Sequence, residues 1–301
     1  MTIVRRIGFQ ALAALLGFAP LAAFATPTAA AGAVLTIQSG GKSRSALIVE
    51  RHRLKAAPRP TLVVLHGQNG SGLRARRNLG LEDLKAPGVA VVYPNALDGR
   101  WDLDTDRDIT FVRDLVAKLV ADRVADPRRI YLVGASTGGV LVYRLACGHA
   151  PLFAGFAALI ATMTAADAAT CRPGAPLAAL AIAGVADPIV PYGGGKSALA
   201  DFKGDLASID ASLAPFRRAA ECGEKKTVEL PDRDPLDGSR VFVDRWQNCR
   251  RPVDLVRVEG GGHALPGRVR LGLDRGQPVG AQNKDVDAAK LVTDFFKRAG
   301  G

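Results

Sequence analysis

Short, continuous apolar runs alternate with segments of helical periodicity along most of the chain. Runs of this kind are typical of strands that are covered on both faces of a sheet. They lie at residues 61–65, 89–93, 130–133, 153–160, 177–183 and 253–258. Segments with apolar residues three or four positions apart predict helices, and these begin near Asp108, Val140 and Asp287. The alternation indicates an α/β fold, with a parallel sheet and helices on both faces.

Two other stretches break this alternation. Residues 34–50 alternate between apolar and polar around Gly40-Gly41, which predicts a β-hairpin. Residues 193–244 show only weak periodicity, and we interpret them as an insertion near the top of the sheet with one helix around residues 208–222. The sequence shows no internal repeat and no linker, so residues 26–301 are expected to form a single domain.

The first 25 residues follow a different pattern. Arg5 and Arg6 precede an uncharged run over residues 11–25, and this run ends in a small-x-small sequence at residues 23–25. The layout is typical of a secretory signal peptide, here residues 1–25. The alternative is a transmembrane anchor, but the run is shorter than the ~20 residues that span a bilayer. We therefore expect a secreted or periplasmic protein with no membrane anchor.

Composition and charge narrow the class of partner. The chain has 301 residues, of which 48% are hydrophobic and 23% charged, a composition typical of globular proteins. Its formal net charge is +11 at pH 7. The lysines and arginines are scattered, with few aromatic residues between them, so they predict a solvated surface and no nucleic-acid partner.

The chain contains four cysteines, at Cys147, Cys171, Cys222 and Cys249. An even number in an exported protein favours disulfides over the alternative of buried free thiols. Three pairings are possible. We favour Cys147 with Cys171 and Cys222 with Cys249, because each pair is sequential and closes a moderate loop. No CxxC motif or His–Cys cluster occurs, so the sequence predicts no metal site and no cofactor.

The candidate chemistry begins at residues 134–138, Gly-Ala-Ser-Thr-Gly. This G-x-S-x-G pattern follows a predicted strand directly and leads into a predicted helix. Such a turn holds its serine in a strained conformation, and the flanking glycines leave room for the backbone. The helix start also places N–H groups near the hydroxyl. We predict that Ser136 is a nucleophile. The alternative is a glycine-rich turn without chemistry.

A serine nucleophile needs a base, and the chain has four histidines. His263 lies in a glycine-rich loop directly after the run at residues 253–258, where open α/β sheets place their active sites. His52 fits a surface position better, His66 a turn, and His149 a packing or surface position. We therefore predict that His263 is the base.

An aspartate is expected to orient the base. Asp187 follows the run at residues 177–183 and so also lies at the end of a strand, whereas Asp254 lies inside one. The order Ser136, Asp187, His263 is the order found in α/β-hydrolases. An Asp-Pro turn without chemistry is the alternative for Asp187 alone.

Acyl transfer also needs hydrogen-bond donors for the oxyanion. The backbone N–H of Thr137, directly after the nucleophile, is one candidate. The other is the N–H of Gln68, in the turn after residues 61–65, where Gly67 permits a close backbone approach.

With these residues, the chain resembles the secreted esterases related to polyhydroxybutyrate depolymerases and feruloyl esterases, from about Ser39 to the C-terminus. The resemblance rests on the motifs Leu65-His66-Gly67, Val92-Tyr93-Pro94-Asn95, Asp126-Pro127, GASTGG at 134–139, ADPIVPY at 186–192, Trp246 before Cys249, and GGGHALPG at 260–267. It implies an α/β-hydrolase fold, with a mostly parallel central sheet and helices on both faces. It also implies that Ser136, Asp187 and His263 form the catalytic triad.

Two positions depart from the family pattern. The family often has His-Gly shortly before the aspartate, where this chain has Ala183-Gly184 before Asp187. The family also often has Thr-Trp directly after the catalytic histidine, where this chain has Ala264-Leu265 after His263. The missing tryptophan removes an aromatic wall near the acyl group, which favours aliphatic hydroxyacyl esters over flat aromatic ones. Trp101 and Trp246 remain as candidate surfaces for stacking on substrate.

The resulting hypothesis is an exported serine esterase that hydrolyses carboxylic esters through an acyl-enzyme. The resemblance favours a polyhydroxybutyrate depolymerase-like enzyme with hydroxyacyl or oligoester substrates, small or oligomeric. Three alternatives stay open. They are a feruloyl or acetyl-xylan type of esterase acting on plant polysaccharide esters, an acyltransferase, and a non-catalytic polymer-binding relative.

Overall fold

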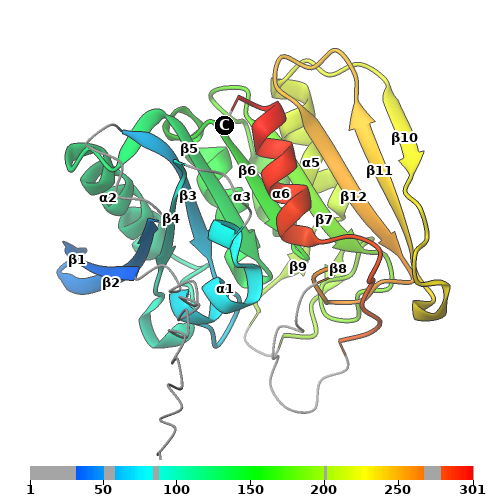
Figure 1. The fold of residues 1–301 in the computed structure, drawn as a ribbon, viewed down its shortest axis with the longest axis horizontal. Coiled ribbons are helices and arrows are strands. Elements are labelled where there is room, and N and C mark those ends of the chain that lie inside the picture. The colour runs from blue at the N-terminus through cyan, green and yellow to red at the C-terminus, as the bar shows by residue number, and fades with distance from the viewer. Residues whose placement is uncertain (1–31, 51–57, 84–87, 200–201, 268–278, 301) are drawn as a thin grey trace, which may run out of the picture.

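The computed structural model describes residues 32–50, 58–83, 88–199, 202–267 and 279–300. The predicted signal peptide and His52 lie outside these residues. The described part forms a large twisted sheet with helices packed against both faces (Figure 1). In this part of the chain, no helix is both long enough and apolar enough to cross a membrane.

The middle of the sheet is parallel, as the apolar runs predict. Its strands are β4 (Ala90–Pro94), β3 (Arg59–Leu65), β5 (Ala125–Ala135), β6 (Gly155–Leu159), β7 (Ala178–Gly184) and β12 (Val253–Glu259), side by side in that order. Antiparallel strands extend both edges. They are β1 (Gly32–Ser39) and β2 (Lys42–Glu50) beside β4, and β11 (Arg240–Trp246) and β10 (Lys225–Glu229) beside β12.

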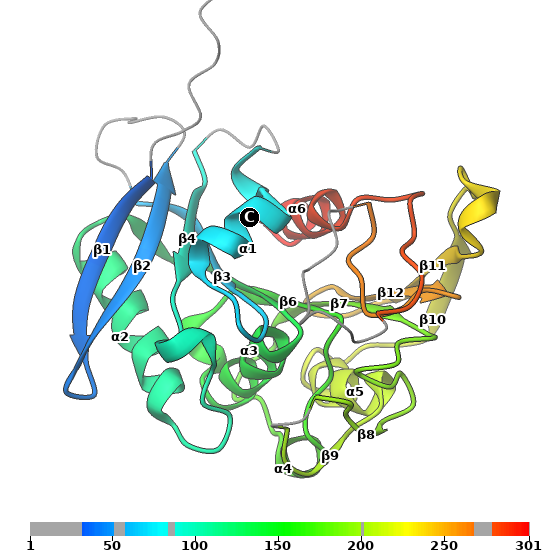
Figure 2. The same ribbon diagram turned by 90° about the horizontal axis from the view of Figure 1, so that it is seen from below.

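The helices form two layers, one on each face of the sheet (Figure 2). One layer contains α1 (Gly72–Leu79) and α6 (Ala288–Arg298). The other contains α2 (Arg107–Ala121), α3 (Thr137–Gly148) and α5 (Ile209–Ala219). Beside α5 lie the short α4 (Ala165–Thr170) and a small ribbon of β8 (Gly195–Lys196) and β9 (Asp205–Leu206).

Strand β3 shows why the central runs are continuously apolar. Val63 and Leu65 point into the layer with α2 and α3, while Leu62 and Val64 point into the layer with α1 and α6. All four residues are at most 5% exposed. Because successive side chains of a strand alternate between faces, a strand covered on both sides must be apolar at every position.

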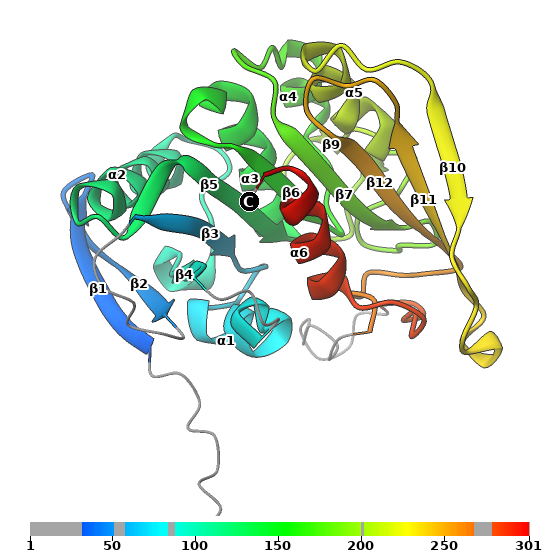
Figure 3. The ribbon, with the colours of Figure 1, turned by 45° about the horizontal axis from the view of Figure 1, so that its top comes forward.

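The interpretation of residues 193–244 as an insertion was partly wrong. The predicted helix is present as α5, but β10 and β11 join the main sheet and form its outer edge (Figure 3). Every residue of β10 is exposed, and β11 mixes buried, half-buried and exposed positions, with Val241, Val243 and Asp244 buried. An exposed edge hairpin therefore carries no continuous apolar run of the kind that predicts a buried strand.

A buried ion pair ties the β1–β2 hairpin to the rest of the molecule. The Arg44 guanidinium lies 2.6 Å from the Asp108 carboxylate, and both side chains are at most 1% exposed. The other carboxylate oxygen of Asp108 accepts a hydrogen bond from the Asp102 N–H at 2.6 Å. Helix α2 begins at Arg107, close to the predicted start near Asp108, so Asp108 lies in its first turn.

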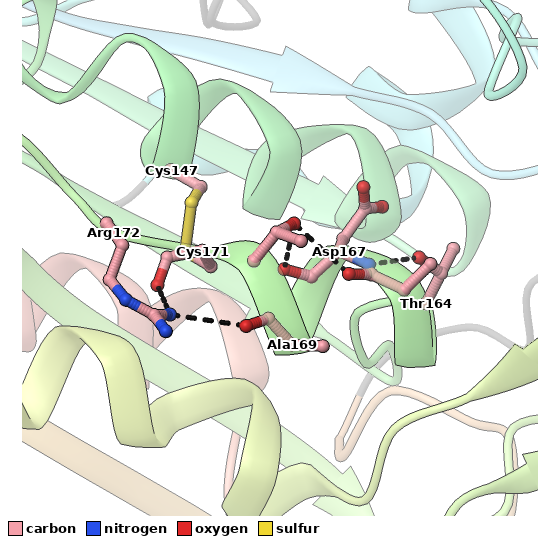
Figure 4. Close-up of a disulfide and its surroundings, with 8 residues drawn as sticks. Cys147, Thr164, Asp167, Ala169, Cys171 and Arg172 are labelled. Carbon is pink, nitrogen blue, oxygen red and sulfur yellow. Dashed lines mark hydrogen bonds between the residues drawn. A yellow bond between two sulfur atoms is a disulfide. The ribbon is translucent and has the colours of Figure 1, made fainter.

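The structure joins Cys147 to Cys171 and Cys222 to Cys249, the pairing favoured from the sequence. The first disulfide connects the end of α3 to the residue that follows α4 (Figure 4). There the Arg172 guanidinium donates to the carbonyls of Cys171 and Ala169. The described residues contain no free cysteine.

We predict that each disulfide stabilises the fold by reducing the conformational entropy of the unfolded chain. Their sequence separations are 24 and 27 residues, and loops of this length correspond to about 3–4 kcal/mol in the chain-entropy model. In urea unfolding, the double variants C147S/C171S and C222S/C249S should each have a free energy of unfolding that is lower than the parent's by this amount. Thiol titration of the unfolded, unreduced protein is the control. Free thiols there would contradict the pairing.

Candidate active site

Ser136 occupies a sharp turn between β5 and α3. Its φ is 54° and its ψ is −125°, a conformation that side chains rarely adopt. The residue is buried, at 1% exposed. Strand β5 ends at Ala135 and helix α3 begins at Thr137, so the whole turn consists of one residue. This is the strained elbow that the G-x-S-x-G pattern predicts.

The glycines around Ser136 are required by close backbone contacts. A Cβ added to Gly134 would lie 2.3 Å from the Gly138 carbonyl oxygen, and one on Gly138 would lie 2.4 Å from the His66 carbonyl oxygen. A Cβ on Gly139 would lie 2.4 Å from the Ala161 side chain. The turn is thus packed against the end of β3 and the segment that follows β6, and only glycine fits at these positions.

The structure brings the three predicted residues into one chain of hydrogen bonds. The hydroxyl oxygen of Ser136 lies 3.0 Å from Nε2 of His263, and Nδ1 of His263 lies 2.7 Å from Oδ2 of Asp187. The side chains of His263 and Asp187 are 0% and 2% exposed. A carboxylate beside Nδ1 holds the proton on that nitrogen, which leaves Nε2 free to accept the proton of the serine hydroxyl.

Asp187 is oriented by its own loop. Its second carboxylate oxygen, Oδ1, accepts hydrogen bonds from the N–H groups of Ile189 and Val190, each at 2.8 Å. The carboxylate therefore has a fixed direction before any substrate arrives. Asp187 thus lies in an Asp-Pro turn and also contacts His263, so the turn does not exclude the predicted role.

The loop that contains Asp187 and the loop that contains His263 are packed against each other through their backbones, without intervening side chains. The Ala186 N–H donates to the Gly261 carbonyl at 2.9 Å. A Cβ on Gly184 would lie 2.3 Å from the Gly262 carbonyl oxygen. Strands β7 and β12 are parallel neighbours, so both loops begin at the carboxyl ends of their strands. Strand β5 ends on the same side of the sheet, at the elbow (Figure 1).

The two predicted oxyanion donors belong to backbone segments that lie next to Ser136. Thr137 is the first residue of α3, so its N–H has no acceptor within the helix. Gly67 lies against the elbow, because a Cβ on it would be 3.4 Å from Cβ of Ser136. This contact brings the turn that contains Gln68 next to Ser136, as the predicted oxyanion hole requires.

His66, predicted to have a turn role, is a buried anchor for that turn. Nε2 of its ring accepts from the Ala96 N–H at 3.1 Å, and Nδ1 lies 2.7 Å from the Gly67 carbonyl oxygen. Burial lowers the pKa of the His66 imidazole, which outweighs the hydrogen bond to Gly67 and the nearby charge of Asp108. A histidine between a buried strand and a glycine was the only sequence signal for this role.

A cleft of about 450 Å³ opens beside the predicted oxyanion donors. Gln68 and Thr137 line it, together with the apolar side chains of Leu97, Leu103 and Phe202. Trp101 also lines the cleft, but it is only 6% exposed. Its indole N–H donates to the His66 carbonyl at 2.7 Å, and its ring lies 4.7 Å from the His66 ring. Trp101 is therefore a fixed part of the wall.

The assignment of Trp246 to the substrate site was wrong. Trp246 ends β11, which is antiparallel to β12, and its neighbour Arg245 is paired with Asp254 near the start of β12. The triad residues lie at or beyond the opposite ends of their strands. Trp246 instead contacts the Arg217 guanidinium of α5, 4.7 Å from the ring centre, at the far edge of the sheet.

In the part of the chain that the structure describes, no three His, Cys, Asp or Glu side chains are grouped so that they could hold a metal ion. The arrangement around Ser136 can move a proton from the hydroxyl to the imidazole and can present two N–H groups to a developing negative charge.

We predict that Gly138→Ala disrupts the elbow. Its Cβ would lie within 2.4–2.6 Å of the carbonyl oxygens of His66 and Leu65, and overpacking of this kind lowers the free energy of unfolding by about 1–3 kcal/mol. Activity should fall as well, because the oxyanion turn is displaced. Gly148→Ala, in the same helix with nothing within 4 Å, is the matched control. Equal stability of the two variants in urea would contradict the prediction.

Comparison with known proteins agrees with this architecture. The alpha/beta hydrolase family model matches residues 62–269, which is most of the chain. The protein NocK of Nocardia uniformis subsp. tsuyamanensis, which is named as an esterase, is 31% identical over 275 residues. That match covers 81% of this chain and 78% of NocK.

Two further relatives are more distant or cover less. Feruloyl esterase C of Emericella nidulans is 32% identical over 190 residues, which span 62% of this chain and 62% of that esterase. The solved structure of an acetyl xylan esterase from Aspergillus awamori has a TM-score of 0.57 at 13% identity. It covers 80% of this chain and 96% of its own, and it shows the likeness of the fold. Fold, elbow and family model agree, and the chain belongs to the alpha/beta hydrolase family.

Proposed function

We propose that the protein is a serine esterase in which Ser136 is the nucleophile. The observation that carries this proposal is the buried chain of hydrogen bonds from Ser136 through His263 to Asp187. Membership of the family, with relatives named as esterases, makes the chain a carboxylic-ester hydrolase. The proposal adds the residues, the mechanism and the substrate.

The proposed reaction has two halves. The Ser136 oxygen attacks the ester carbonyl while Nε2 of His263 takes its proton, and the same proton then passes to the leaving alcohol. Water, deprotonated by His263, attacks the acyl-enzyme. His263 then returns this proton to the Ser136 oxygen as the bond to the acyl group breaks and the acid is released. Asp187 keeps the imidazole in the required tautomer and stabilises it while it is charged.

The oxyanion of both tetrahedral intermediates is bound by the N–H groups of Gln68 and Thr137. Their placement supports this role: one follows Gly67, which lies against Ser136, and the other begins α3. Each such donor contributes about 10²–10³-fold to the rate.

For the substrate, we propose hydroxyacyl esters or short oligoesters. The cleft volume of about 450 Å³ lies in the range that holds ligands much larger than an acetyl group. Its wall is mixed, with Leu97, Leu103 and Phe202 beside charged residues such as Lys42 and Asp98. An amphipathic chain of ester units, apolar in its methylenes and polar in its carbonyls, suits such a wall.

A feruloyl ester is the second candidate. Two observations favour it: Trp101 and Phe202 place aromatic side chains in the cleft wall, and several relatives are named as feruloyl esterases. Against it, Leu265 follows the histidine where the family often has a tryptophan, and this leucine is buried in the core instead of lining the cleft.

We also propose that residues 26–301 act as one catalytic domain after export to the periplasm or the exterior. The signal-like sequence at residues 1–25 and the two disulfides support export, because disulfides persist in oxidising compartments.

Replacing Ser136 tests the mechanism. Ser136→Ala should leave the fold intact and lower kcat for p-nitrophenyl ester hydrolysis by about 10³–10⁶-fold. A fluorophosphonate probe should label the parent and not the variant. Ser43→Ala, an exposed serine in β2, is the matched control and should behave as the parent. Retained activity of Ser136→Ala would disprove the assignment. Absence of labelling in the parent would favour the non-catalytic relative.

A substrate panel separates the two candidate substrates. We expect kcat/KM for 3-hydroxybutyrate oligomers to exceed that for methyl ferulate, because the cleft has an extended mixed wall and a single tryptophan. The reverse order would favour the feruloyl ester. Adding an acceptor alcohol to the same reactions and analysing the products distinguishes hydrolysis from acyl transfer.

A further inference from the structure

Both ring nitrogens of His66 are engaged, and their roles are determined by their partners. The Ala96 N–H can only donate, so Nε2, 3.1 Å away, is the acceptor and carries no proton. In the neutral ring the proton is then on Nδ1, which donates to the Gly67 carbonyl at 2.7 Å. The ring is buried, with 3% of the residue exposed, which favours this neutral form.

The Gly67 carbonyl and the Gln68 N–H belong to the same peptide group. A trans peptide is planar, and its C=O and N–H point in opposite directions. The described residues contain no cis peptide bond. Holding the Gly67 oxygen against the His66 ring therefore also sets the direction of the Gln68 N–H, the proposed oxyanion donor.

The ring is itself held in place from two sides. The His66 carbonyl accepts the indole N–H of Trp101 at 2.7 Å, and the two rings are in contact. On the other side, the turn folds back over the hydrogen bond at Gly70. A Cβ there would lie 2.7 Å from both the Gly67 oxygen and Nδ1 of His66. The position of Nδ1 leaves the peptide little freedom to rotate.

We propose that His66 is a positioning residue that aims and polarises the Gln68 N–H toward the oxyanion. This inference rests on the proposed function. A hydrogen bond to a peptide oxygen strengthens the donor at the other end of the same peptide. His66 thus acts on the transition state without touching the substrate, and its loss lowers kcat more than it raises KM.

Two substitutions divide the functions of the ring. In His66→Asn, the side-chain amide nitrogen takes the place of Nδ1 and can still donate to Gly67. In His66→Gln, the amide oxygen takes the place of Nε2 and can still accept from Ala96, but the donor to Gly67 is lost. A role confined to anchoring the turn predicts similar behaviour of the two variants, in proportion to their stability.

The test measures kcat, KM and the affinity for an alkyl boronic acid, which forms a tetrahedral adduct with the serine. His66→Gln should lower kcat and kcat/KM together by about 10²-fold with KM nearly unchanged, as for loss of one oxyanion donor. Boronate affinity should weaken in parallel, and His66→Asn should recover most of the loss. Equal kinetics in the two variants, or unchanged kcat in His66→Gln, would overturn the proposal.

Two further variants keep the result interpretable. If the His66 variants do not fold, Gly70→Ala keeps the imidazole but places a Cβ against both the Gly67 oxygen and Nδ1 of His66, which disturbs the hydrogen bond between them. It should lower kcat with KM nearly unchanged, and a parental kcat would overturn the proposal. Ser136→Ala in the same assay distinguishes a failure of the proposed function from a failure of the positioning role alone. If it keeps activity, the proposed function fails, whereas an inactive Ser136→Ala beside a fully active His66→Gln refutes only the positioning role.

Discussion

The close approach of two backbone segments, the elbow at Ser136 and the end of β3, is the constraint on which the rest of the site depends. The contact between Gly138 and the carbonyls of Leu65 and His66 leaves no space for a side chain. It holds Ser136 in its strained conformation and brings the Gly67 turn alongside the hydroxyl. A strained backbone conformation persists only where the surrounding structure holds it in place. Here the backbone on both sides of the elbow does this, at the end of β3 and after β6.

The acid and the base reach Ser136 because of the order of strands in the sheet. Strands β5, β6, β7 and β12 are parallel neighbours, so the loops that follow β5, β7 and β12 emerge at one edge. Backbone contacts between Gly184 and the 261–262 peptide then lock the acid loop to the base loop. Each member of the triad is thus positioned by main-chain packing, and few side chains are needed between them.

The sequence allowed the central strands and the meeting of Ser136, Asp187 and His263 to be predicted because both depend on local patterns. A strand buried on both faces must be apolar throughout, and residues at the ends of such strands are brought together by topology. The edge strands β10 and β11 escaped prediction because neither carries a continuous apolar run: β10 is exposed throughout, and β11 mixes buried and exposed positions. The position of Trp246 was predicted wrongly for the same reason. Because β11 runs antiparallel to β12, its last residue lies beside the start of β12, away from the strand ends that carry Ser136, Asp187 and His263. The anchoring bonds of His66 depend on residues distant in sequence, such as Ala96.

The buried pair of Arg44 and Asp108 links sequence-distant parts of the cleft wall in a way that bears on how the protein can evolve. Lys42 and Asp102 both line the cleft, one on the hairpin and the other bonded to Asp108. Because a buried charge is strongly destabilising without its partner, Arg44 and Asp108 must be inherited together. The hairpin and the residue 102–108 segment therefore form one recombination unit, and exchanging substrate preference between homologues by hairpin grafting requires transferring both pieces.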